Sequence, residues 1–326
     1  MTLRLAVIVI IAGAVAGART PSGSLGALLL PNSTRPAVIA ASGEFTVEAQ
    51  QRGDLRLIGE AAEFPLSPEW KDTPGGHTRA EVVAPGGMPA GAYALEWTSG
   101  DEADRNIRAV YVIAPPETQN PFSQQYAFAC VSVDATSGES TVIADVAQRI
   151  DDAQAQFAVV FVRGPEDRFP GIVAALDACA TPTVVIADAP ESACRRWFGP
   201  ATFSFSYGPD TFIAPASGRA GIGDEIGSVT GTIAKLRHDA KTSRWTVGLF
   251  SEAGARLSMR NEITLFVDDT LHACIYGSAD GKDRTDAPKA WAGWFEPPLH
   301  FAVIKDRATL FAVNRKEVAL VKQGQR

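Results

Sequence analysis

Several features that mark common protein functions are missing from this sequence. Basic residues form no cluster, and the chain carries 30 Lys and Arg against 37 Asp and Glu, a formal net charge of −7. An acidic chain without a basic patch has no electrostatic footprint for nucleic acid. There is no G-x-S-x-G segment and no Cys with an evident His partner, which disfavours nucleophilic Ser or Cys chemistry. The Gly-rich stretch GRAGIGDEIG follows no strand of a βα unit, which disfavours dinucleotide binding.

Long apolar runs are also scarce, and the only one lies at the N-terminus. Residues 1–18, MTLRLAVIVIIAGAVAGA, combine an early Arg, an apolar run and small residues at alternate positions before the end. This layout is typical of a secretory signal peptide with cleavage near Ala18. We therefore expect an exported protein, periplasmic or secreted, that contacts a membrane only if residues 1–18 are retained as an anchor. No Cys follows the small residues, which argues against a lipoprotein.

Cysteine is limited to four residues, which in an exported chain permits disulfides but leaves three connectivities open. Cys130 and Cys274 lie in strand-like apolar runs, where a small buried hydrophobic residue is the simplest interpretation. Cys179 and Cys194 flank a predicted strand, TPTVVIA, and could therefore pair. A Cys179–Cys194 disulfide is one expectation, and two unpaired thiols are the other.

Residues 19–118 are predicted to form an antiparallel β-sandwich that resembles immunoglobulin and fibronectin domains. Short segments of alternating polar and apolar residues are separated there by turns rich in Gly, Pro and Asp. The predicted strands are EFTVEAQ, LRLIGEA, RAEVVAP, YALEWTS and RAVYVIAPP. The stretch from residue 19 to about residue 36, rich in Ser, Pro, Gly and Leu, is predicted to be a linker or the first strand.

Residues 119–326 show a different pattern, which predicts an α/β domain. The apolar segments YAFACVSVD, FAVVFVRG and PTVVIAD alternate with two amphipathic segments, STVIADVAQRIDDAQA and FPGIVAALDACA. Such alternation is typical of βαβ units and a largely parallel sheet. Further strand-like segments follow Trp197, with one helical segment, IGSVTGTIAKLRHDAK, among them. We therefore expect a second sheet in the later half of the chain.

This order of elements resembles that of the calcineurin-like metallophosphoesterases, in particular the purple-acid-phosphatase-like branch. The resemblance covers roughly residues 122–314. It rests on element order and on the segment WFGPATFSFSYGPDTFIAPAS, which is similar to a strand pair after the third metal-binding turn of that family. It implies an α/β fold with a four-layer αββα sandwich after the N-terminal β-sandwich. Active members hold two divalent metals on carboxylate, amide and imidazole ligands at strand ends, where the metals activate water and bind phosphoryl oxygens.

The resemblance also implies where those ligands should lie, and most of the expected side chains are absent. The family motifs are Asp-x-His, Gly-Asp, Gly-Asn-His-Asp/Glu, an isolated His and Gly-His-x-His. The first strand keeps Asp134 and has Thr136 in place of His; the second keeps Gly164 and has Pro165 in place of the bridging Asp. The later positions carry Ala187, Asp188, Ala189 and Pro190, then Ser251, then Gly277, Ser278 and Asp280. Since the proline side chain has no donor atom, a bridging metal would lose its central ligand.

Histidine is too scarce to restore such a site. The chain has His77, His238, His272 and His300, and none ends a predicted strand in the required register. We expect His77 and His238 to be solvated, and His272 and His300 to pack in or beside the core. The sequence therefore predicts a catalytically inactive family member, a pseudoenzyme with no metal or other cofactor. We expect it to act as a binding or structural subunit of a cell-envelope assembly.

Two alternatives remain open. A divergent metal-dependent phosphoesterase could hold one hard cation, Mg²⁺ or Ca²⁺, on oxygen atoms alone. Its ligands would be carboxylates at strand ends, namely Asp134, Asp188, Glu191, Glu252 and Asp280. The other alternative is a membrane-associated structural subunit, which requires residues 1–18 to remain in place.

One segment is a candidate contact surface for a partner. KAWAGWFEPPLHF places Trp291, Trp294 and Phe295 close together beside Gly and Pro residues. Aromatic residues at this density are typical of an interface anchor, and a loop folded over the core is the alternative. The expected partner is another envelope or secreted protein.

Overall fold

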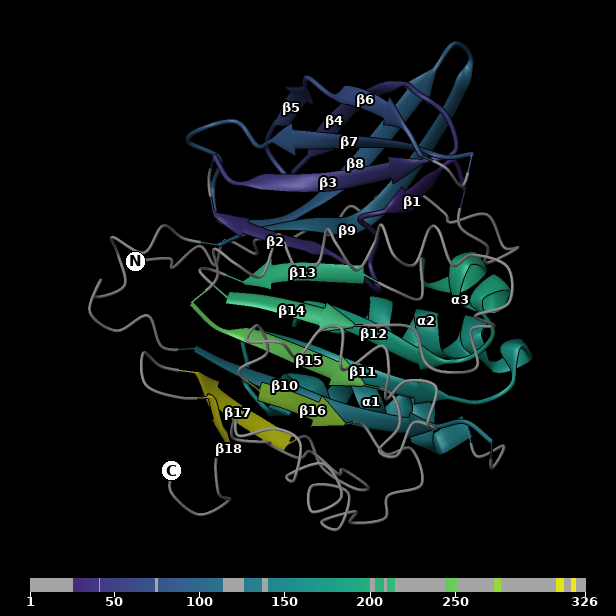
Figure 1. Cartoon of the computed structure of the whole chain (residues 1–326), viewed down its shortest axis with the longest axis vertical. Coiled ribbons are helices and arrows are strands. Elements are labelled where there is room, and N and C mark those ends of the chain that lie inside the picture. Colours follow the sequence, from purple (N-terminus) through teal and green to yellow (C-terminus); the bar gives the residue numbers. More distant parts are fainter. Residues whose placement is uncertain are drawn as a thin grey trace, which may run out of the picture.

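The structure, a computed structural model, describes most of the first predicted domain and the main strands and helices of the second. The described residues are 26–40, 42–73, 76–113, 126–136, 140–199, 203–207, 210–214, 244–250, 273–276, 309–313 and 318–320. Figure 1 shows two bodies of strands, β1–β9 above and β10–β18 below, and the described helices belong to the second body. The chain is thus rich in strands that form several sheets, as the sequence predicts.

Two sheets form the first body, with the orders β1-β3-β7-β6 and β2-β9-β8-β4-β5. Buried and exposed residues alternate along strands such as β3 and β4, so one face of each sheet contributes to a shared core around Trp97. The strands are β1 (Leu28–Leu30), β2 (Ala37–Ala40), β3 (Glu44–Ala49), β4 (Asp54–Ile58), β5 (Glu63–Leu66), β6 (Glu69–Asp72), β7 (Thr78–Val83), β8 (Gly91–Ser99) and β9 (Glu102–Ile113). One pairing differs from the antiparallel prediction. β2 runs parallel to β9, because the chain crosses from one sheet to the other between β1 and β2.

The second body also contains two sheets. The first has the order β12-β11-β10-β17-β18, in which β10, β11 and β12 are parallel and β17 and β18 are antiparallel to their neighbours. The second has the order β13-β14-β15-β16, in which only β13 is antiparallel. The strands are β10 (Tyr126–Asp134), β11 (Phe157–Arg163), β12 (Thr183–Asp188), β13 (Phe203–Tyr207), β14 (Asp210–Ala214), β15 (Thr246–Phe250), β16 (Ala273–Tyr276), β17 (Thr309–Val313) and β18 (Val318–Leu320).

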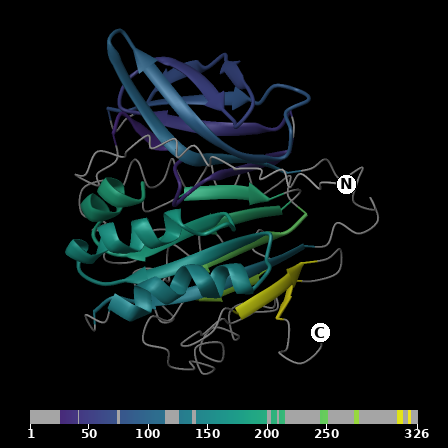
Figure 2. The ribbon, with the colours of Figure 1, turned by 180° about the vertical axis from the view of Figure 1, so that it is seen from behind.

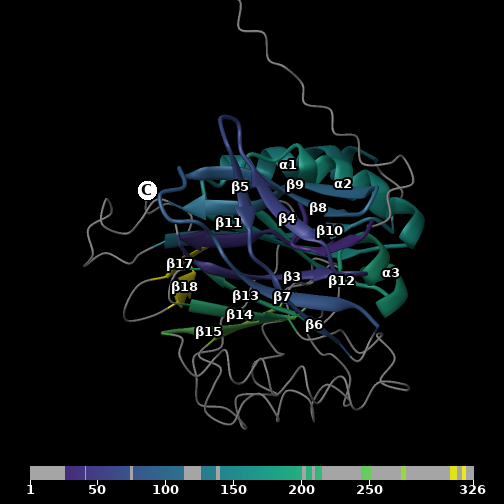
Figure 3. The same ribbon diagram turned by 90° about the horizontal axis from the view of Figure 1, so that it is seen from above.

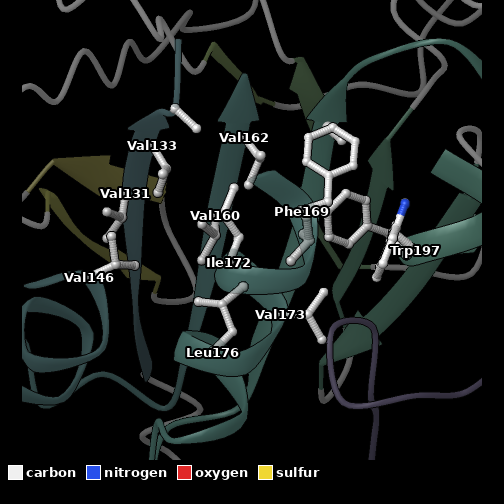
Figure 4. Packing of buried hydrophobic residues seen from close by; sticks show 14 of the residues in the cluster. Val131, Val133, Val146, Val160, Val162, Phe169, Ile172, Val173, Leu176 and Trp197 are labelled. Atoms are coloured by element: carbon white, nitrogen blue, oxygen red, sulfur yellow. The ribbon is translucent and has the colours of Figure 1, made fainter. Parts of the chain in front are cut away.

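Helices cover one face of the first of these sheets, as Figure 2 shows from behind. They are α1 (Ser140–Asp152), the short 3₁₀ helix η1 (Glu166–Arg168), α2 (Phe169–Asp177) and α3 (Glu191–Trp197). Figure 4 shows Val131 and Val160 of the sheet facing Ile172 and Leu176 of α2. Apolar residues at helical spacing meet alternate strand residues here, so burial of this apolar surface holds the helices on the sheet.

The opposite face of the same sheet packs against the second sheet through aromatic side chains. Phe128 and Phe157 stack with ring centroids 5.2 Å apart, and Phe212 of β14 meets Phe128 edge to face at 5.3 Å. The residues of β10, β11 and β12 therefore alternate between a helix-facing core and a sheet-facing core. The described layers run helix, sheet, sheet.

Three predicted elements lie outside the described residues. They are residues 1–18, the helix at residues 226–241 and the strand at residues 299–306. Among the helices that are described, none has the length and apolar character needed to span a membrane.

Residues 32–35 join the two bodies, although the sequence predicts only a linker or a strand there. They lie between β1 and β2 and are buried. The Val185 amide donates to the Thr34 carbonyl (2.8 Å), and Arg35 Nε donates to the Val185 carbonyl (3.2 Å). Because β12 is an edge strand, these bonds cover main-chain groups that would otherwise be open to another chain. β2 packs against the edge strand β13 nearby, and Figure 3 shows the first body lying over the second.

Arg108 of β9 makes another link between the bodies. Its backbone has a φ of +50°, in the left-handed region, at an irregularity in the pairing of β9 with β8. Its guanidinium donates to Tyr111 Oη (2.8 Å) and to the carbonyls of Asp177 (3.1 Å) and Ala180 (2.9 Å), at the end of α2 and just beyond it. A bulge redirects a side chain, and a cation is favourable at a helix C-terminus. The unusual backbone therefore directs Arg108 onto the second body.

Candidate functional site

The parallel strands β10, β11 and β12 bring one polar residue each to a common row at their carboxyl ends. Asp134 is paired with Arg163, and Arg163 with Asp188. Residues paired in this way point to the same face of the sheet. Their neighbours Val133 and Val162 face the helices, so the row lies on the face turned toward the second sheet. Open α/β sheets bind ligands at this edge, which makes the Asp134–Arg163–Asp188 row the candidate site.

Arg163 places a positive charge in the middle of this row. Its Nε lies 4.0 Å from Asp188 Oδ2, and the two side chains are 33% and 5% exposed. A nearby cation stabilises a buried carboxylate, and here the cation belongs to the protein itself. Sequence reasoning missed Arg163 because it precedes the Gly-Pro motif and has no equivalent among the expected ligands.

Asp134 is hydrogen-bonded within its own turn. Its Oδ1 accepts hydrogen bonds from the Thr136 amide (2.9 Å) and from Thr136 Oγ1 (2.5 Å). Thr136 thereby holds the neighbouring carboxylate in place. The Ala135 amide donates to the Arg163 carbonyl (2.8 Å), which fixes this turn against β11.

The loop after β11 is tied to both of its neighbours. A Cβ atom at Gly164 would lie 2.8 Å from Ala135 Cβ, so glycine allows the close approach of the two loops. Glu166 Oε1 accepts hydrogen bonds from Arg196 Nη1 (2.8 Å) and Trp197 Nε1 (3.1 Å). These bonds connect η1 to α3 near the carboxyl ends of β11 and β12. Nothing in the local sequence predicts them, because the partners lie about 30 residues apart.

Two prolines that follow β11 and β12 have a structural role at helix starts. Pro165 and Pro190 are both exposed and immediately precede η1 and α3. Proline suits a helix start because the first amide groups of a helix have no partner within it. Ala189 is buried beside them, and Glu191 is the first residue of α3.

In the structure no disulfide joins Cys179 to Cys194, which was one of the two expectations, and both residues are buried. Cys179 precedes β12 and Cys194 follows it, so a strand of roughly 20 Å separates residues whose Cα atoms would have to lie within about 7 Å. Cys194 Sγ instead lies 3.5 Å from the Ala189 carbonyl. Burial raises the pKa of the Cys179 thiol to about 12, and the charge of Asp151 adds to this.

We expect Cys130, Cys179 and Cys194 to resist alkylation in the native protein and to react fully after unfolding without a reductant. Burial keeps all three thiols out of reach of the reagent, and it raises the pKa of Cys130 and Cys179. Mass spectrometry of peptides labelled with iodoacetamide, with and without prior reduction, measures this. A Cys179–Cys194 cross-linked peptide that disappears on reduction would contradict the expectation.

A further polar cluster at the amino ends of the strands joins the two sheets of the second body. Asp210, at the start of β14, is fully buried and accepts hydrogen bonds from Arg244 Nε (2.9 Å), Arg244 Nη2 (2.5 Å), Tyr126 Oη (2.9 Å) and the Trp245 amide (3.1 Å). Burial and the Asp210 charge raise the pKa of Tyr126, and the hydrogen bond to Asp210 raises the pKa of Arg244. With these partners Asp210 is a structural carboxylate. In the sequence, only the turn residues before β14 indicate where Asp210 lies, namely at the start of a strand.

Part of the predicted metal site lies within the described residues. Within the ranges that the structure describes, no group of three or more His, Cys, Asp or Glu residues could hold a metal ion. The remaining predicted positions, Ser251, Glu252, Gly277, Ser278 and Asp280, lie outside those ranges, as do Trp291, Trp294, Phe295, His238, His272 and His300. The structure therefore brings Asp134 and Asp188 together in one row with Arg163 between them.

Comparison with known proteins adds no family to this picture. No protein-family model matches the sequence, and no curated protein matches it. Amylomaltase from Corynebacterium glutamicum is similar over 41% of this chain and 21% of its own, with 12% identity and a TM-score of 0.21. A titin A168169 structure is similar over 30% of this chain and 54% of its own, with 9% identity and a TM-score of 0.18. The chain thus spans only part of each, and TM-scores this low carry no argument about function.

Proposed function

We propose that this chain is an exported, catalytically inactive metallophosphoesterase-like protein that serves as a binding or structural subunit of a cell-envelope assembly. The observation that carries the proposal is the position of Arg163 between Asp134 and Asp188. An arginine takes the middle position of this row, which under the resemblance corresponds to the strand ends where those enzymes gather carboxylates around metal ions. Two cations close together repel, so Arg163 opposes the binding of a divalent metal there.

The layer order supports the fold part of this proposal. Helices, a mixed sheet and a second sheet follow one another in the described residues, as they do in three layers of an αββα sandwich. We propose that the helix expected at residues 226–241 supplies the fourth layer. The β-sandwich before it has the position expected for a purple-acid-phosphatase-like chain. In this proposal the whole chain acts as a scaffold that binds another protein of the same compartment.

A single-metal phosphoesterase is the second candidate, because Asp134 and Asp188 share one face and one row. Oxygen ligands suit Mg²⁺ or Ca²⁺. Against it, Asp134 is already hydrogen-bonded to Thr136, and Asp188 lies beside Arg163.

The two candidates differ in metal content. Protein purified from its native compartment without chelators is expected to carry less than about a tenth of an equivalent of Mg²⁺, Ca²⁺ or any transition metal. It should also fail to hydrolyse phosphodiesters when these metals are added. Elemental mass spectrometry against protein concentration measures the first property, and release of a chromogenic phenol measures the second.

Arg163→Ala tests whether the charge of Arg163 is what opposes the binding of a metal ion. The substitution removes a positive charge from the row that holds the two carboxylates, so the affinity for Mg²⁺ or Ca²⁺ should rise at least about tenfold. Arg168→Ala, which removes an exposed charge from η1 nearby, should leave it unchanged. One or two metal equivalents in the unaltered protein, lost on Asp134→Ala or Asp280→Ala, would instead identify a divergent enzyme.

A further inference from the structure

The segment that joins the two bodies also contains an asparagine-glycosylation signal. Asn32-Ser33-Thr34 fits the pattern N-x-[ST], and no other stretch of the chain does. In an exported protein such a signal usually marks an exposed loop, since the attached sugar must reach solvent. In the structure, however, Asn32, Ser33 and Thr34 are buried.

Asn32 is fully buried, and every polar atom of its side chain is occupied. Nδ2 donates to the carbonyls of Leu29 (2.8 Å) and Phe198 (3.2 Å). Oδ1 accepts from the Thr34 amide (3.0 Å), from Thr34 Oγ1 (2.7 Å) and from the Arg35 amide (3.0 Å). Phe198 belongs to the second body, so Asn32 shapes the segment and also fastens it across the boundary between the bodies.

Glycosylation is incompatible with this arrangement. The transfer forms a bond between Asn32 Nδ2 and the anomeric carbon of a sugar and breaks that carbon's bond to oxygen of a lipid-linked diphosphate. The diphosphate leaves with the electron pair, and one amide proton is lost to a base. One of the two hydrogen bonds from Nδ2 then disappears, and a bulky polar group lies where the side chain has no exposed surface. Residues 32–35 could no longer cover β12.

We propose that Asn32 must stay unmodified for the two bodies to dock, so that this chain is exported by a route on which asparagine glycosylation does not precede folding. The inference rests on the export in the proposed function and adds the kind of compartment to it. A bacterial-type envelope fits this requirement, and a glycosylating secretory pathway does not.

The test uses the full chain behind a host secretory leader in a glycosylating eukaryotic host, so that entry does not depend on residues 1–18. We expect the unaltered chain to carry a glycan on Asn32 and to be retained in the cell. Thr34→Val removes the signal while keeping Asn32 and the side-chain shape, and should raise the secreted yield at least about fivefold. Peptide mass spectrometry measures occupancy, and immunoassay of the medium measures yield.

Two controls separate the glycan from other effects. In a bacterial periplasm without asparagine glycosylation, Thr34→Val, which loses the bond from Thr34 Oγ1 to Asn32 Oδ1, should accumulate to no higher level than the unaltered chain. Adding Glu60→Asn and Ala62→Thr to Thr34→Val creates a signal in the exposed turn after β4; its glycan should be present and tolerated, which also proves entry into the glycosylating compartment. Equal secretion of the unaltered chain and Thr34→Val in the eukaryotic host, with or without a glycan, would overturn the proposal. That result would not count against the proposed function, which the metal measurement tests separately.

Discussion

Replacing Asp210 by asparagine is expected to lower the free energy of unfolding by about 3–5 kcal/mol. The substitution keeps the shape of the side chain and removes its charge. Arg244, whose side chain is 17% exposed, then loses the carboxylate that accepts hydrogen bonds from its Nε and Nη2. The shift in the urea midpoint of unfolding, followed by circular dichroism, measures the loss.

An exposed ion pair supplies the matched control. Arg52 and Asp72 bond at 2.9 Å with side chains 58% and 72% exposed, so Asp72→Asn should change stability by less than about 1 kcal/mol. The double substitution Asp210→Asn with Arg244→Met removes both charges, keeps a polar side chain beside Tyr126 Oη and the Trp245 amide, and should cost less than Asp210→Asn alone. If Asp210→Asn unfolds at the same midpoint as the unaltered protein, the cluster does not hold the two sheets together.

The second large effect is expected for Arg35→Ala, at about 2–4 kcal/mol. Arg35 is 4% exposed, donates to the Val185 carbonyl and places its guanidinium carbon 4.0 Å from the centre of the Phe203 ring. Without it, residues 32–35 lose their hold on β12, and the Val185 amide should exchange with solvent faster. Hydrogen exchange resolved by residue detects this directly.

Arg52→Ala, which removes an exposed guanidinium from the first body, is the charge control for Arg35→Ala and should leave Val185 protected. Limited proteolysis provides an independent readout, since undocking exposes the chain between β1 and β2. Unchanged exchange at Val185 in Arg35→Ala would mean that other contacts hold the segment in place.

The sequence predicts the centre of the second body well. β10 matches the predicted segment at both ends, and β11 and β12 begin and end within one residue of theirs, because each is a mostly apolar run that ends in a charged residue. α3 was missed because seven residues carry too little periodicity to reveal a helix.

What the sequence could not predict depends on partners far along the chain. The stretch PNSTR has the composition of a linker, and it is buried only because Val185 and Phe198 meet it. Asp210 and Arg244 are 34 residues apart, and neither lies in a motif. In the sequence Arg163 looks like any charged residue at the end of a strand. Only the strand register places it between Asp134 and Asp188. Pairings of this kind are set by packing, which residue order alone does not express.

The contacts of residues 32–35 form late, because their partners are synthesised long after the segment itself. Arg35 bonds to a residue 150 positions later, and Asn32 to one 166 positions later. At typical rates of translation, about 8–30 s pass between synthesis of the segment and of its partner strand. During that interval the first body can assemble its sheets, but its docking segment has nothing to dock on. A chain whose first body folds during synthesis therefore carries a β-sandwich with its docking segment uncovered until β12 is made.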